Sequence, residues 1–173
     1  MSTVKKIRIW LTLFIIALVL SGLTAFPLES ELRWGAGILH SSPAPQLLPG
    51  LVEWVDRVRN ALVITNDRFP FLAYGTDWLA FAHLVIAVAF IGPLRDPVRN
   101  IWVIQFGIIA CVGIIPLALI AGAVRGIPLG WQFIDMSFGV IGAAPLLIVY
   151  RLIRRLELQQ VAEQHRVDAQ RAD

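Results

Sequence analysis

Four long apolar stretches alternate with polar segments along the chain. They cover approximately residues 7–27, 77–94, 101–124 and 131–150. About 20 consecutive apolar residues are enough for a helix to cross a bilayer. The pattern therefore predicts an all-α polytopic membrane protein with four transmembrane helices in a single membrane domain. The polar turn 92–100 is short, which makes the second and third spans antiparallel neighbours.

Residues 28–75 form the one sizeable polar segment between spans. Pro43, Pro45 and Pro49 interrupt regular structure in its first part. From Leu48 to Leu62 apolar residues recur at helical spacing, with charged residues on the other face. This indicates one amphipathic helix of about four turns. The favoured interpretation is that it covers the bundle, and the alternative is that it lies on the membrane surface.

Composition agrees with a membrane protein. The 173 residues are 57% hydrophobic and 16% charged, whereas a soluble domain is about 25% charged. The mean hydropathy is +0.72. A net charge of +3 is too small to suggest a nucleic-acid partner. The expected partners are the lipid bilayer and either another membrane protein or further copies of this chain. The single cysteine, Cys111, excludes an intramolecular disulfide.

The basic residues predict an orientation, because cytoplasmic loops are enriched in Lys and Arg. With four spans, three clusters fall on the same side: Lys5, Lys6 and Arg8; Arg95 and Arg99; Arg151, Arg154 and Arg155. Both termini should then be cytoplasmic, with residues 28–75 external and 151–173 a cytoplasmic tail. Compact loops and the lack of an N-x-[ST] site in the external segment favour a bacterial cytoplasmic (inner) membrane.

The first apolar stretch also resembles a secretory signal peptide, because basic residues precede it. A retained helix is favoured, since the stretch is long and Leu23 occupies a position where a cleavage site prefers a small residue. Cleavage remains the alternative. Ala17, Ser21 and Ala25 recur at a spacing of four, which would let another helix approach closely.

His83 and Asp135 are ionisable residues inside apolar stretches, where such groups are costly and often functional. Each shares a helix face with small residues, and small faces are where membrane helices touch: Thr76, Ala80 and Ala87 with His83; Gly139 and Gly142 with Asp135. Helical rise places the two side chains about 9 and 6 Å deep from the external end. We expect them to meet there as a polar site, with Asp77 and Arg125 at its rim. Asp77 or Thr76 is also a suitable helix cap.

Three roles for His83 and Asp135 stay open: a structural pair, a ligand or proton site, and a metal site. His83 and His40 are the candidate metal or haem ligands, but no two histidines have ligand spacing, and zinc needs three or four ligands. HExxH, GxSxG, P-loop and GxGxxG motifs are absent from the sequence. The sequence therefore identifies neither a cofactor nor a catalytic residue.

The function that the sequence favours is an integral membrane binding or accessory protein with a polar His/Asp site near the external face. One alternative is a redox, metal- or haem-binding membrane protein. Another is a membrane enzyme acting on a lipid or quinone, with His83 as general base and Asp135 orienting it. A fourth is proton passage through an oligomer, with Asp135 as the relay.

Overall fold

The computed structural model describes residues 2–172, apart from the side chains of residues 167, 171 and 172. This part of the chain is all-α, as the sequence predicts, and contains no strand. The helices are α1 (Thr3–Ala25), α2 (Leu28–Ser41), α3 (Ala44–Leu47), α4 (Pro49–Arg68), the 3₁₀ helix η1 (Pro70–Ala73), α5 (Tyr74–Ala89), α6 (Ile91–Arg95), α7 (Ile101–Arg125) and α8 (Leu129–Ala172).

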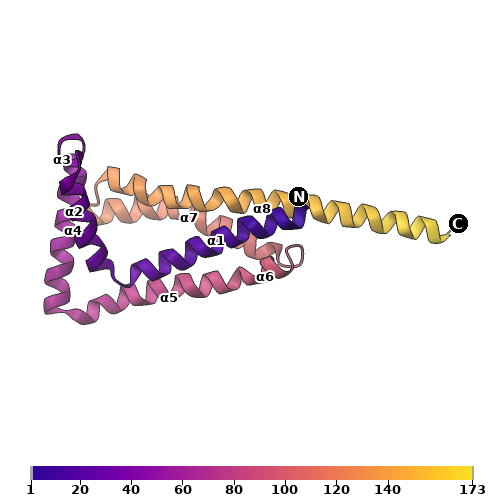
Figure 1. Cartoon of the computed structure of the whole chain (residues 1–173), viewed down its shortest axis with the longest axis horizontal. Coiled ribbons are helices and arrows are strands. Elements are labelled where there is room, and N and C mark those ends of the chain that lie inside the picture. Colours follow the sequence, from indigo (N-terminus) through magenta and orange to yellow (C-terminus); the bar gives the residue numbers. More distant parts are fainter. Residues whose placement is uncertain (1, 173) are drawn as a thin grey trace.

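Four helical segments are long and apolar enough to cross a membrane: Thr3–Ala25, Pro70–Arg95, Ile101–Arg125 and the first part of α8. They form two hairpins. In one, α1 packs against α5, and in the other, α7 packs against α8. The hairpins are joined where α1 also packs against α8 (Figure 1). Helix α8 continues far past residue 150 as one helix of 44 residues, so the polar tail prolongs the fourth span.

Helices α2, α3 and α4 lie across one end of the spans, and we call residues 28–68 the cap (Figure 1). The prediction of a single amphipathic helix is wrong in number, because α2 precedes α4 and packs against it. Val52 and Val55 of α4 and Ala36 of α2 are buried at this contact. Two polar contacts tie the pair together. Asn66 Nδ2 donates to Glu29 Oε2 at 2.7 Å, and His40 Nε2 lies 2.8 Å from Asp56 Oδ2.

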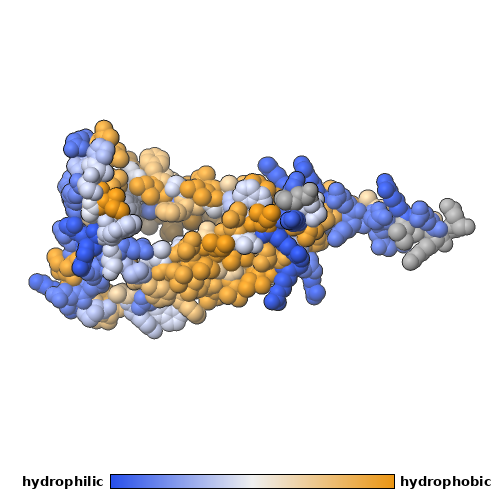
Figure 2. Space-filling view, in the orientation of Figure 1, coloured by the Kyte–Doolittle hydropathy of each residue, from blue (hydrophilic) through white to orange (hydrophobic). Residues whose placement is uncertain are grey.

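The three basic clusters gather at the end of the spans opposite the cap, which we call the basic end (Figure 2). Here the start of α1, the turn around α6 and the point where α8 leaves the bundle come together (Figure 1). The side chains of all eight residues are exposed. The three basic clusters, which the sequence predicts to share one side of the membrane, therefore lie together at one end of the bundle.

The apolar core of the bundle lies in the half of the spans next to the basic end. We call this the basic half. Ile7, Leu11, Ile104 and Leu146 are 0% exposed, and Phe90 is 1% exposed. The rings of Phe14 and Phe90 lie 4.8 Å apart between centroids. A methyl group at Gly107 of α7 would meet Phe90 at 2.7 Å and Leu146 at 2.8 Å. Glycine at this position therefore lets three of the four spans come into contact.

The other half of the spans, the cap half, is built differently. Its close contacts are within each hairpin. A Cβ added at Gly22 of α1 would lie 2.9 Å from the carbonyl oxygen of Ala80 on α5, and one at Gly122 of α7 would lie 2.5 Å from Gln132 on α8. The buried core cluster contains no residue that joins the two hairpins at this level. In the described part of the chain, the hairpins are thus held together mainly in the basic half.

Candidate functional site

His83 lies in the cap half of α5 and is half-buried. Its Cβ is on the side of α5 that packs on α1, since a Cβ at Gly22 would be 3.2 Å away. Its ring Nδ1 lies 2.8 Å from the carbonyl oxygen of Leu79, one turn earlier. Residues seven apart share a helix face. His83 is seven residues before Phe90, so it lies on the same side of α5 as a ring that packs in the core.

Asp135 has the corresponding position on α8. It is half-buried and lies one turn before Gly139, where a Cβ would be 2.5 Å from the Cys111 carbonyl oxygen of α7. Gly142, seven residues after Asp135, lies between two helices, since a Cβ there would be 3.0 Å from Cys111 Sγ of α7 and 3.8 Å from the Phe14 ring of α1. Among the described residues Asp135 has no ion-pair partner.

The two hairpins diverge in the cap half, and we call the space between them there the wedge. Figure 1 shows α1 and α5 diverging from α7 and α8 towards the cap, and Figure 2 shows the surface hollowed there. A step of seven residues corresponds to about 10 Å along a helix. His83 and Asp135 thus both lie roughly 10 Å closer to the cap than the contact that joins the hairpins.

No hydrogen bond or ion pair joins His83 and Asp135 among the described residues. The nearest polar partner of His83 is a carbonyl of its own helix. Helix α5 packs on α1, whereas α8 packs on α7 and α1. The direct hydrogen bond expected from the two small faces is not formed, because each face packs within its own hairpin. The functional role of both residues stays a prediction.

Asp77 lies in the first turn of α5, but it does not cap the helix. The prediction of a cap by Thr76 or Asp77 is wrong, because α5 begins at Tyr74 directly after η1. The Thr76 hydroxyl instead donates to the Ala73 carbonyl at 2.6 Å. An acidic side chain in a first turn still interacts favourably with the helix dipole. Asp77 stands next to four exposed aromatic side chains on an open surface: Phe26, Tyr74, Trp78 and Phe81.

Arg125 is the last residue of α7 and is exposed. Gly126 follows with φ 64°, the left-handed conformation that ends many helices, and Ile127 N–H donates to Gly122 O at 2.9 Å. In the described residues Arg125 forms no ion pair with Asp135. The structure therefore places Arg125 at the cap end of the spans without joining it to the polar pair.

The two candidate metal ligands lie on different parts of the molecule. His40 belongs to the cap, where it contacts Asp56. His83 belongs to the wedge. The described residues contain no group of three or more His, Cys, Asp or Glu side chains able to hold a metal ion. A site that uses protein ligands alone is thus not formed around either histidine in the described part of the chain.

Gln132 is a buried polar residue that the sequence did not single out as a site. It is 4% exposed, and its Nε2 donates to the Ile127 carbonyl at 2.8 Å. Its side chain packs over Gly122. The signal available in the sequence was a glycine near the end of one span and an amide near the start of the next. Gln132 therefore closes the α7–α8 turn and is a structural residue.

The chain matches no protein-family model, no curated protein and no solved structure.

Proposed function

We propose that the protein is an integral membrane binding or accessory protein that takes up an amphiphilic ligand in the wedge. The observation that carries this proposal is that His83 and Asp135 belong to separate hairpins and are both half-buried without a side-chain partner among the described residues. Sites between the helices of a bundle commonly combine apolar walls with a few convergent polar groups. We infer that the wedge is such a site, with His83 and Asp135 as its polar groups.

The energetics of an isolated carboxyl group support a ligand. A polar group taken out of water without a partner costs roughly 2–7 kcal/mol. Asp135 is half-buried in an apolar stretch, and a bound polar head group would supply the hydrogen bonds that the described residues do not. The apolar body of the same ligand would fill the space between the hairpins. A lipid or a quinone has this chemistry.

The proposed orientation has both termini in the cytoplasm and the cap outside, in a bacterial inner membrane. The gathering of eight basic side chains at one end supports it, since cytoplasmic loops are enriched in such residues. Single cysteines at Ser41 and Gln159 in a Cys111→Ser background test it in whole cells. A membrane-impermeant maleimide should label position 41 only. Labelling of position 159 and not 41 would reverse the orientation.

The ligand itself is tested by mass spectrometry of the full chain purified in detergent. A stoichiometric small molecule should accompany the wild type and be lost in His83→Ala and in Asp135→Asn. Val85→Ala and Phe138→Ala are matched controls, because both side chains are exposed on the same two helices. A wild type that carries no small molecule, or the same occupancy in all variants, would contradict the proposal. A co-purified polypeptide lost in the same two variants would make a partner helix the occupant.

A cofactor-binding protein is the second candidate, and one contact favours it. Metal-ligating histidines usually donate their other ring N–H to a carbonyl or carboxylate. Nδ1 of His83 contacts the Leu79 carbonyl in this way, which leaves Nε2 for a ligand. An absorption spectrum and metal analysis of the same purified proteins decide between the candidates. A stoichiometric haem or metal that disappears in His83→Ala would establish the cofactor.

A further inference from the structure

Eight basic side chains from three segments of the chain meet at the basic end (Figure 2). Helix α1 packs against both α6 and α8, so the start of α1 lies between the turn around α6 and the point where α8 leaves the bundle. The eight side chains therefore surround one packed junction. We call them the basic surface: Lys5, Lys6, Arg8, Arg95, Arg99, Arg151, Arg154 and Arg155.

The backbone that carries the charges of α1 and α8 is fixed by the apolar core. Arg8 follows Ile7 and Arg154 follows Ile153, and both isoleucines are 0% exposed in the same core cluster. Successive residues of a helix are about 100° apart around its axis, since a turn takes about 3.6 residues. Each arginine thus stands at the edge of a packed contact, and its backbone is already ordered before an anion binds.

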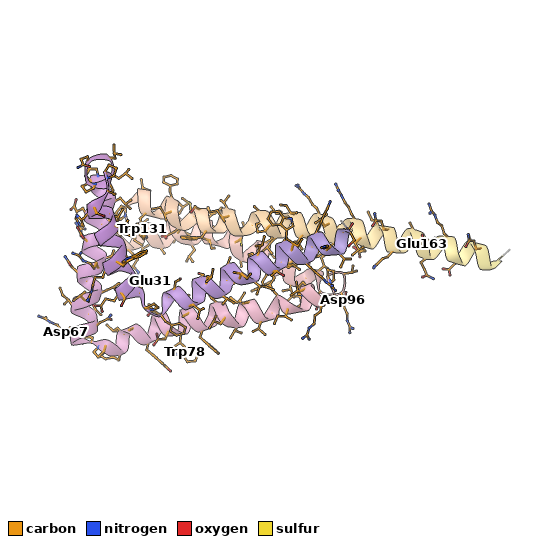
Figure 3. The ribbon with its side chains drawn as sticks, in the orientation of Figure 1. Glu31, Asp67, Trp78, Asp96, Trp131 and Glu163 are labelled. Atoms are coloured by element: carbon orange, nitrogen blue, oxygen red, sulfur yellow. The ribbon has the colours of Figure 1, made fainter. Side chains whose placement is uncertain are left out.

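The acidic residues closest to the basic surface are already engaged. Asp96 lies at this end of the spans, whereas Glu163 lies farther out along α8 (Figure 3). Asp96 Oδ1 accepts a hydrogen bond from the backbone N–H of Arg99 at 3.1 Å, and Glu157 Oε2 lies 2.8 Å from Nη1 of Arg154. In the part of the chain that the structure describes, the other members of the basic surface form no ion pair. The positive charge of this end is therefore largely uncompensated by the protein itself.

The basic surface stands at the ends of the apolar lengths. One segment long and apolar enough to cross a membrane begins at Thr3, and another ends at Arg95. Trp10 of α1 and Trp102 of α7 are exposed near the same end, and tryptophan is enriched where the hydrocarbon of a bilayer meets water. In a bilayer the eight charges would consequently lie at the level of the lipid head groups.

We propose that the basic surface binds the head group of an anionic phospholipid. Six of its eight residues are arginines, and a guanidinium can donate two parallel hydrogen bonds to the oxygens of one phosphate. Clusters of about four to eight basic residues beside a membrane helix attract anionic lipids. Ile9 and Leu13 of α1 are exposed next to the charges, and they offer an apolar surface to the acyl chains. A lipid matches both features, whereas a free anion contacts the charges alone.

Isothermal titration of the full-length protein in a neutral maltoside detergent tests the proposal. The probe is a short-chain phosphatidylglycerol, and a short-chain phosphatidylcholine and inorganic phosphate are its controls. Arg8→Gln with Arg95→Gln removes two charges from the basic surface and should weaken binding about 25-fold, or about fivefold for each charge. Arg68→Gln with Arg125→Gln is the matched control, because it lowers the net charge equally and both side chains are exposed at the cap end.

Saturable binding of phosphatidylglycerol that is weakened in the basic-surface pair and unchanged in the cap-end pair supports the proposal. A second pair, Lys5→Gln with Arg155→Gln, should weaken binding to a similar extent and replaces the first pair if circular dichroism shows that the first does not fold. Equal binding of phosphatidylglycerol and phosphatidylcholine, an equal loss in the basic-surface and cap-end pairs, or equal affinity for inorganic phosphate would overturn the proposal. Because the basic surface lies at the opposite end of the spans from the wedge, this result is independent of the proposed wedge ligand.

Discussion

The basic half and the cap half of the spans are built from the same four long helices but are packed differently. In the basic half, large apolar side chains from α1, α7 and α8 meet Phe90 and are almost completely buried. In the cap half, the two hairpins diverge (Figure 1), and the buried core cluster does not join them there. The comparison indicates that the basic half holds the hairpins together, and the cap half is where we propose that a ligand binds.

The largest effect on stability is expected in the basic half. Leu146 is 0% exposed and packs beside Phe90 and Gly107. Leu146→Ala would leave a cavity between the hairpins and should cost about 3 kcal/mol of unfolding free energy. Reversible unfolding in mixed micelles measures it. The matched variant is Leu147→Ala, whose side chain is 41% exposed and should cost less than about 1 kcal/mol. Equal losses would show that the basic half is not the main contact.

A smaller loss of unfolding free energy is expected at Gly139, where α7 and α8 approach each other closely. A Cβ at Gly139 would lie 2.5 Å from the backbone oxygen of Cys111, so α7 and α8 would have to move apart. Gly139→Ala should cost about 2 kcal/mol, as overpacking does. Gly113→Ala is the control, because a Cβ there meets nothing within 4 Å and alanine favours helix. A Gly139→Ala protein as stable as wild type would contradict the packing described for α7 and α8.

Substitutions in the cap should lower the free energy of unfolding by a still smaller amount. His40 and Asp56 contact each other at 2.8 Å with side chains 50% and 27% exposed. Pairs of this kind contribute roughly 0.2–1 kcal/mol. A double-mutant cycle of His40→Ala and Asp56→Ala should therefore give a coupling of about 0.5 kcal/mol. A coupling near zero would mean that the His40–Asp56 contact does not help to hold α2 against α4.

The four long apolar helices and the gathering of the basic clusters at one end could be predicted from sequence, because length, hydropathy and the number of crossings determine both. The partners of each helix could not. The spacing of Ala17, Ser21 and Ala25 suggested a contact face, yet Ala17 and Ser21 are exposed and Gly22 makes the close approach to α5. A face of small residues indicates that a helix packs closely against another helix, but it does not identify that neighbour.

The direct contact predicted between His83 and Asp135 is not formed for the same reason. Both residues share a helix face with small residues, but those faces pack within each hairpin, with His83 beside Gly22 and Gly139 against Cys111. Helix α2 could not be predicted because its apolar positions pair with α4 across the intervening prolines, and such a pairing between separate segments leaves no local pattern in the sequence.

The most direct test of the account is a second double-mutant cycle, with His83→Ala and Asp135→Asn in ligand-free protein. Because no hydrogen bond or ion pair joins the two side chains, their effects on unfolding free energy should add to within about 0.5 kcal/mol. A coupling of about 1 kcal/mol or more between His83 and Asp135 would show that they form a structural pair across a closed bundle, and the wedge would not exist as described.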